Sequence, residues 1–288
     1  HMEFGRLEEA TDNYQKAIAV QPEFAEAHNN LGSVYRGQGL LKEACIKFRK
    51  ALTLKPEFAE AHNNLGLVHC EMGNLVRAFL SYQKALTIKS NFAEAHNNLG
   101  SLFYEQGNVD EAVESIDKAV SYQPEKVGWR VKKALLLPII PFSQESIETF
   151  REARTKAIPV FINEELTIED PTQDVGVTNF YLAYHGQNNR GLMQDAANLY
   201  LTLCPKLSYQ AKHCQFTERT KKEILRIGFL SSHLRAHTIA NLTRGIIEHL
   251  SRDLFEVIVF RLPGKKDEVS EAIDETADQV VSLYQNLE

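Results

Sequence analysis

Apolar and small residues recur along the first 124 residues with a period longer than a single helix. The string Ala-Glu-Ala-His-Asn-Asn-Leu-Gly occurs three times, with its histidines at His28, His62 and His96. The period is therefore 34 residues, which is long enough for two helices and the turn between them. Within each period the apolar residues follow helical spacing, and a glycine separates two runs. The pattern predicts a repeated helix-turn-helix unit.

Fixed positions of each unit carry small or bulky residues. We expect Gly32 and Ala44 to let the two helices of a unit approach closely, Tyr35 and Phe48 to fill the space between them, and Gly39 to take the positive φ of the turn. With these positions the segment 1–124 resembles the tetratricopeptide repeat family, as three full units and one partial unit. The resemblance implies an α-solenoid in which neighbouring units stabilise one another. The positions in the first full unit are Leu31, Gly32, Tyr35, Gly39, Ala44, Phe48, Ala51 and Pro56.

The partial unit comes first and holds only the second helix of a repeat. Its residues in the same register are Gly5, Ala10, Tyr14, Ala17 and Pro22. A repeat without its neighbour leaves an apolar face uncovered. We therefore expect self-association through this end, or fraying of residues 3–20. His1-Met2 resembles a remnant of cloning, and we expect the chain to be a fragment of a longer protein.

The period stops at Pro124, and residues 125–222 are predicted to form a mostly helical linker region. Ser143 is a candidate helix N-cap. Two apolar stripes at helical spacing follow, separated by residues 163–176, which are acidic and turn-rich and are predicted to form a loop. The first stripe is Ile147, Phe150, Ala153 and Ala157, and the second is Leu192, Ala196, Leu199 and Leu203.

Residues 223–288 change to alternating strand and helix patterns. Strands are predicted at 224–230, 255–260 and 279–284, with helices at 239–250 and 269–277. This alternation predicts a parallel sheet, here an incomplete Rossmann-like unit with about half of the usual strands. The predicted fold class is thus mainly α: a solenoid, a helical linker and a partial α/β unit.

Composition excludes several classes of protein. The net charge is −6, so the chain lacks the basic footprint of a nucleic-acid-binding protein. The longest apolar stretch, 134–142, is interrupted by Pro138 and Pro141 and is too short to span a membrane. The four cysteines form no Cys-x-x-Cys pair, and no secretory signal opens the chain. We expect reduced thiols and a cytoplasmic protein without membrane or nucleic-acid partners.

One asparagine per unit is the candidate peptide-binding residue: Asn30, Asn64 and Asn98. Stacked units would align these amides in a row on the concave face. Because an amide both donates and accepts, such a row can bind the backbone of an extended peptide. The alternative is that these asparagines only bond to neighbouring units, which is the role we expect for Asn29, Asn63 and Asn97. Glu26, Glu60 and Glu94 on the same helices disfavour a clamp for a terminal carboxylate.

Two further sets of residues invite a chemical interpretation. His28, His62 and His96 lie one period apart and cannot surround one metal ion, so we expect them to be packing residues and predict no metal site. The loop after the first predicted strand carries Ser231, Ser232, His233, Arg235, His237 and Thr238. Sites in parallel sheets lie at the carboxyl ends of strands, which makes His237 a candidate acid or base. No G-x-G-x-x-G motif follows the strand, so no dinucleotide site is predicted.

The segment from Arg226 to Phe260 resembles the opening of the catalytic region of protein O-linked N-acetylglucosamine transferases and their bacterial relatives. Residues 178–186 and 203–205 do so as well, and repeats ahead of such a region fit the same family. The resemblance implies a two-lobed enzyme that uses a UDP-sugar, with repeats that guide the protein acceptor. His237 matches a histidine on the acceptor side of that site, although Ala236 replaces the usual asparagine.

The resemblance implies that the chain supplies acceptor recognition and part of the acceptor lobe of a protein O-glycosyltransferase. The parent would transfer a sugar from UDP-N-acetylglucosamine, or a related donor, to Ser or Thr. Because the second lobe of the family holds the nucleotide, we expect this chain alone to bind no cofactor and to be inactive. The alternative is a non-catalytic repeat scaffold whose α/β end mediates interaction.

Overall fold

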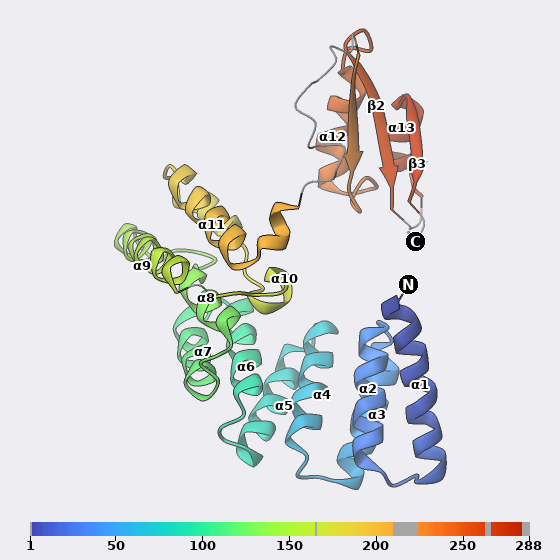
Figure 1. The fold of residues 1–288 in the computed structure, drawn as a ribbon, viewed down its shortest axis with the longest axis vertical. Coiled ribbons are helices and arrows are strands. Elements are labelled where there is room, and N and C mark those ends of the chain that lie inside the picture. The colour runs from blue at the N-terminus through green and yellow to red at the C-terminus, as the bar shows by residue number, and fades with distance from the viewer. Residues whose placement is uncertain (1, 165, 210–223, 263–265, 284–288) are drawn as a thin grey trace. The chain divides into compact units, whose positions relative to one another are not determined.

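A computed structural model describes residues 2–164, 166–209, 224–262 and 266–283. The chain divides into a helical unit over residues 6–209 and a unit within residues 210–288 that holds all described strands (Figure 1). The predicted fold class is confirmed, because a helical solenoid is followed by a small parallel sheet. The predicted domain boundary at residue 222 lies outside the described residues.

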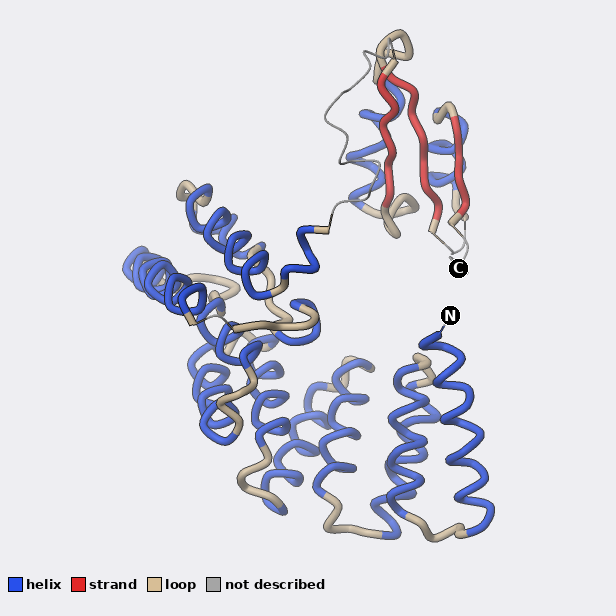
Figure 2. The backbone as a smooth tube through the Cα atoms, viewed as in Figure 1, coloured by secondary structure: helices blue, strands red, loops and turns tan. Residues whose placement is uncertain are grey.

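The repeats form three antiparallel helix pairs preceded by a single helix, α1 (Met2–Val20). Figure 2 shows the pairs as helices joined by short turns. Gly39, Gly73 and Gly107 occupy the turn within each pair with φ of 76°, 74° and 82°, as predicted for Gly39. The pairs are α2 (Ala25–Gly37) with α3 (Leu41–Leu54), α4 (Ala59–Glu71) with α5 (Leu75–Ile88), and α6 (Ala93–Glu105) with α7 (Val109–Tyr122).

Each pair is held together by a bulky side chain that lies on a glycine of the facing helix. A Cβ atom added to Gly32 would lie 2.8 Å from the ring of Phe48, and one added to Gly66 would lie 2.5 Å from the ring of Tyr82. Both rings are buried. The predicted close approach is therefore confirmed, and the side chain that requires it comes from the second helix of the unit.

The partial repeat differs from the prediction at its glycine. Gly5 lies inside α1 instead of at a turn. In α3, Ala44 and Phe48 are fully buried, whereas their counterparts in α1, Ala10 and Tyr14, are only half-buried. The apolar face of α1 is thus partly uncovered, and self-association through it stays a prediction.

The packing of the solenoid continues one helix beyond Pro124. Helix α8 (Val127–Leu135) packs against α7. Its Lys132 stands 34 residues after Asn98 and donates a hydrogen bond to Asn97 Oδ1 at 3.4 Å. Asn98 in turn donates to Asn63 across the same sequence separation of 35 residues. The repeated sequence pattern thus ends at Pro124, as predicted. The spacing of the hydrogen bonds between neighbouring units nevertheless continues to α8.

The linker contains two longer helices, and the structure corrects the stripe predicted for the first. Helix α9 (Gln144–Asn163) begins with a capping box at Ser143, as predicted. Ile147 is buried, but Ala153 is exposed and the inward position is taken by Arg154. Arg154 faces inward because its guanidinium donates to the Leu135 carbonyl and to Asn179 Oδ1.

Helix α11 (Arg190–Leu203) buries all four residues of the second predicted stripe, so that prediction is confirmed. The predicted loop at 163–176 contains one short helix, α10 (Pro171–Asp174). The described part of the linker also contains two 3₁₀ segments, η1 (Phe180–His185) and η2 (Pro205–Ser208). Within the described parts of the chain, no helix is long and apolar enough to cross a membrane.

The α/β unit is a parallel sheet with strand order β1-β2-β3 and both helices packed on one core. Its central strand buries Val257 and Val259 against Ile247 of α12 and Ile273 of α13. The predicted strands and helices are confirmed within one or two residues, and the last predicted strand residue lies outside the described chain. The elements are β1 (Leu225–Leu230), α12 (Thr238–His249), β2 (Phe255–Arg261), α13 (Glu268–Thr276) and β3 (Gln279–Ser282).

The glycine contact within each pair predicts the outcome of two matched substitutions. Gly66→Ala should destabilise the helical unit by about 1–3 kcal/mol, because the new methyl overlaps the buried Tyr82 ring and outweighs the better helix propensity of alanine. Gly191→Ala in α11 meets no atom within 4 Å and should leave stability unchanged or raise it. Thermal unfolding followed by circular dichroism tests both, and equal effects of the two substitutions would contradict the packing.

Candidate peptide-binding face and strand-end loop

The predicted asparagine row is present on the first helices of the repeats. Helix α2 contacts α4, and α4 contacts α6, so these helices form one continuous surface. Asn64 Nδ2 donates to Asn29 Oδ1 at 3.0 Å, and Asn98 Nδ2 donates to Asn63 Oδ1 at 2.9 Å. The structure therefore joins the two asparagine sets by hydrogen bonds that link neighbouring repeats.

This network leaves hydrogen-bonding capacity unused. Each amide nitrogen carries two N–H groups, and Asn64 and Asn98 each use one of them between repeats. Asn30 is exposed, and Asn64 and Asn98 are half-buried, so water or a ligand can reach their remaining polar atoms. Bonding between units and binding of a peptide backbone are thus compatible roles for the same side chains, and the second role stays a prediction.

The repeated histidines close the loop that leads into each first helix. Nε2 of His28 lies 3.0 Å from the carbonyl oxygen of Pro22, and Nε2 of His62 lies 3.0 Å from that of Pro56. His96 makes the same contact with the carbonyl oxygen of Ser90. Burial lowers the pKa of His62. The sequence predicted a packing role, and the structure adds a hydrogen bond to the residue six positions earlier. Over the described ranges, no group of three or more potential ligands could hold a metal ion.

The second predicted site residue, His237, caps the helix that follows β1. Its Nδ1 accepts a hydrogen bond from the Ile239 backbone N–H at 3.2 Å. The ring stacks on His233, with ring centroids 4.2 Å apart and planes inclined by 22°. Because Nδ1 accepts, the proton of the neutral ring is on Nε2. The exposed edge of His237 is therefore a hydrogen-bond donor, and its role as an acid or base stays a prediction.

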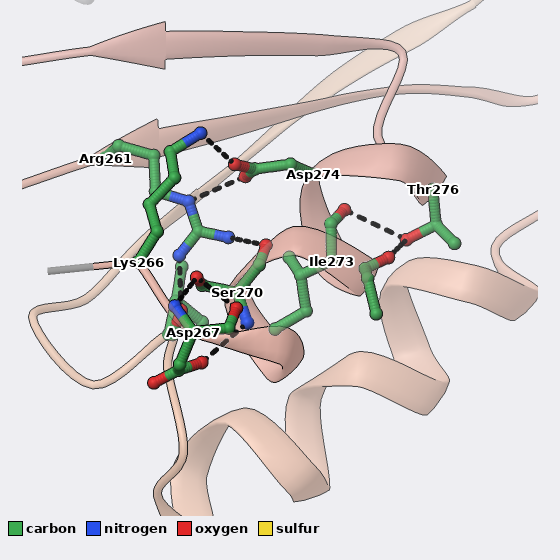
Figure 3. Close-up of polar contacts among 9 residues, drawn as sticks. Arg261, Lys266, Asp267, Ser270, Ile273, Asp274 and Thr276 are labelled. Carbon is green, nitrogen blue, oxygen red and sulfur yellow. Dashed lines mark hydrogen bonds and ion pairs between the residues drawn. The ribbon is translucent and has the colours of Figure 1, made fainter.

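Figure 3 shows Arg261, at the end of β2, bonded to Ser270 and Asp274 of α13. Arg261 forms an ion pair with Asp274 of α13 at 2.6 Å, and its guanidinium also donates to the carbonyls of Ser270 and Leu234. Leu234 belongs to the β1–α12 loop, so one side chain connects this loop to α13. Sequence reasoning missed this role, because Arg261 closes a strand without any motif around it.

Asp267 makes a second connection between the loop and α13. One carboxylate oxygen accepts from the Ala236 N–H at 2.8 Å, while the other accepts from the Ser270 N–H and caps α13. These hydrogen bonds lower the pKa of the Asp267 carboxyl. The residue next to His237 is thus fixed by a carboxylate, which also places a negative charge at this edge of the sheet.

Comparison with models of protein families identifies the repeats. Models described as TPR repeat match residues 1–39, 32–73 and 69–107, and a model described as tetratricopeptide repeat matches residues 93–126. No curated protein sequence matches the chain. Residues 1–126 are therefore tetratricopeptide repeats.

The chain is similar to several solved structures. An O-GlcNAc transferase mutant of Thermobaculum terrenum is 16% identical, with a TM-score of 0.52 over 90% of this chain and 41% of that chain. The protein MamA is 23% identical over 55% and 86% of the two chains, with a TM-score of 0.43. A thermophilic TPR protein of Thermus thermophilus is 27% identical over 47% and 76%, with a TM-score of 0.43. The chain thus spans about two-fifths of the transferase chain, whose fold it shares.

Proposed function

We propose that the chain supplies the acceptor-recognition repeats and part of the acceptor lobe of a UDP-sugar-dependent protein O-glycosyltransferase. The observation that carries the proposal is the fold similarity to an O-GlcNAc transferase over 90% of the chain. That similarity extends beyond the 126 residues matched by the repeat models. The order of repeats, helical linker and strand-helix alternation supports the same assignment.

In this proposal the repeats bind an extended segment of the acceptor protein. The row of Asn30, Asn64 and Asn98 offers donors and acceptors to the peptide backbone, which every sequence presents. Two of these amides are oriented by bonds to the preceding repeat, so little side-chain entropy is lost when a peptide binds. Recognition through the backbone would allow one face to accept many protein segments.

The proposed reaction joins the anomeric carbon of the sugar to a Ser or Thr oxygen of the acceptor. The bond between that carbon and the UDP oxygen breaks, and the hydroxyl proton is released. Such a displacement requires the donor and the hydroxyl to be aligned. His237, with its Nε2–H exposed at the carboxyl edge of the sheet, is proposed to orient the acceptor or the leaving group by a hydrogen bond.

A non-catalytic scaffold is the second candidate function. It is favoured by the intact asparagine row, which depends only on the repeats and on no residue of the α/β unit. Both candidates require peptide binding, but only the transferase requires His237. Activity measurements on His237 variants therefore distinguish them.

Replacing Asn30, Asn64 and Asn98 together with alanine should weaken peptide binding at least about tenfold, since each lost hydrogen bond contributes about 0.5–1.5 kcal/mol. The probe is a fluorescein-labelled dodecapeptide selected from a random library against the unaltered chain, measured by fluorescence anisotropy. Asn29→Ala with Asn63→Ala removes the same bonds between repeats but keeps the proposed ligand groups. This double variant should lower thermal stability and weaken binding less than the triple variant does, because it only loosens the row and keeps its ligand groups.

A matched surface control uses Thr53, Thr87 and Ser121, which recur with the same period on the second helices. Each hydroxyl donates only within its own helix. Their joint replacement with alanine should leave peptide affinity unchanged. Equal affinities of the asparagine variant and this control variant would remove the asparagine row from the proposal.

The chain should show no measurable affinity for UDP, with a Kd above about 1 mM by calorimetry. A diphosphate needs free backbone N–H groups or cations, and helix N-termini are the usual source in such folds. Within residues 224–262 and 266–283, the side chains of His237 and Asp267 already cap α12 and α13. Stoichiometric micromolar binding would show that these residues do hold the nucleotide.

Substitutions of His237 separate helix capping from a role in turnover. The longest natural protein that carries this chain is assayed for sugar transfer from UDP-N-acetylglucosamine to a protein acceptor. His237→Ala should reduce turnover by about 100-fold or more. His237→Asn restores the N-cap without the imidazole, so it should restore stability but leave turnover low. Recovery of turnover in His237→Asn would reduce His237 to a structural cap.

A further inference from the structure

Lys132 stands in the row of asparagines, one repeat after Asn98, and it is buried. The residue is only 8% exposed. Its ammonium donates to Ser101 Oγ at 2.5 Å and to Asn97 Oδ1 at 3.4 Å. At the last position of the row, the side chain is therefore a cation where the earlier positions have a neutral amide.

This lysine lines a cavity of about 580 Å³ that opens to the surface of the helical unit. The walls come from α6, α8, the segment around α10 and η1, and α11. Around the lysine the lining is polar and aromatic: Glu105, Tyr104, Thr178, Tyr181 and Tyr200. The cavity therefore has the size and the polar groups to receive a side chain of a bound ligand.

The lysine has hydrogen-bond partners but forms no ion pair among the described residues. No carboxylate in those parts of the chain lies within 4 Å of its Nζ. Glu105 shares the cavity, and its negative charge raises the pKa of Lys132, but its exposed side chain forms no ion pair with the ammonium. A buried cation without a paired anion is costly to maintain, and a ligand anion would offset that cost.

The ammonium also has a donor to spare. It carries three N–H groups, of which two are used by Ser101 and Asn97. Burial lowers the pKa of Lys132 to about 8, so the side chain is still mostly protonated at pH 7. Both the charge and one N–H are therefore available in neutral solution.

We propose that this cavity binds the carboxylate of an aspartate or glutamate side chain in the peptide that lies along the asparagine row. The inference rests on the proposed peptide-binding function and adds a preference for acidic sequences to it. The carboxylate comes from a side chain and not from a chain end, because the proposed ligand is an internal segment of a protein acceptor. Backbone contacts at the asparagines would hold the peptide, and Lys132 would select which segments bind.

The test selects binders from a random dodecapeptide library displayed at the N-terminus of a phage coat protein, where no peptide carboxyl end is free. Peptides selected by the unaltered chain should be enriched in Asp or Glu at one position. In synthetic form, changing that residue to its amide should weaken binding at least fivefold. Lys132→Met should bind the acidic and amide peptides equally, because methionine fits the buried site without a charge.

Lys133→Met is the matched control. Lys133 is the next residue on α8, but it is exposed and pairs with Asp117 outside this cavity. This variant should keep the preference for the acidic peptide, and circular dichroism verifies that both variants are folded. Persistence of the preference in Lys132→Met, or its absence in the unaltered chain, would overturn the inference while leaving peptide binding in place. Failure to select any peptide would remove the proposed function as well.

A pH series adds a second readout. The other titratable groups that line the cavity are Glu105 and Tyr104 on α6, Tyr181 in η1 and Tyr200 on α11. A lysine with a lowered pKa loses its charge as the pH rises through about 8, so the acidic peptide should lose affinity by up to about tenfold between pH 7 and pH 9. The amide peptide, and either peptide with Lys132→Met, should change little. An equal loss for all four combinations would contradict the assignment to Lys132.

Discussion

The contact between a glycine of one helix and a bulky side chain of its partner sets the geometry on which the rest of the repeats depends. Phe48 on Gly32 and Tyr82 on Gly66 leave no room for a Cβ atom, so each helix pair has one closest approach. Because the same contact recurs every 34 residues, equivalent positions of successive units are brought into register. The asparagine row follows from this register and does not need any special local structure.

Register also explains why a binding face can change its chemistry without a change of fold. Asn64 and Asn98 reach back to the preceding repeat across 35 residues, and Lys132 reaches back across the same separation. The equivalent position of each unit thus makes the same kind of contact, whether its side chain is an asparagine or a lysine. In the α/β unit the constraint is different: Arg261 and Asp267 fix the β1–α12 loop from outside, so His237 is placed by side chains distant in sequence.

Much of the fold could be predicted because the same sequence pattern occurs three times, and each copy supports the interpretation of the others. Three copies of one pattern define the helix pairs, and Gly39 and Ser143 mark a turn and a helix start by their own chemistry. The position of Arg154 could not be predicted, since its burial depends on a carbonyl and an amide from other segments. The continuation of the solenoid to Lys132 could have been found by adding 34 to Asn98. The network around Arg261 carries no such signal.

The central claim is that the asparagine row contacts the peptide, and side-chain amide NMR tests it most directly. A library-selected dodecapeptide is titrated into the chain with the asparagine side chains labelled with ¹⁵N. The account predicts that the Nδ2 resonances of Asn30, Asn64 and Asn98 shift on binding. Those of Asn74 and Asn108, which are exposed at the turns within the helix pairs, should stay in place. Binding that shifts the turn asparagines and leaves the row unchanged would contradict the account.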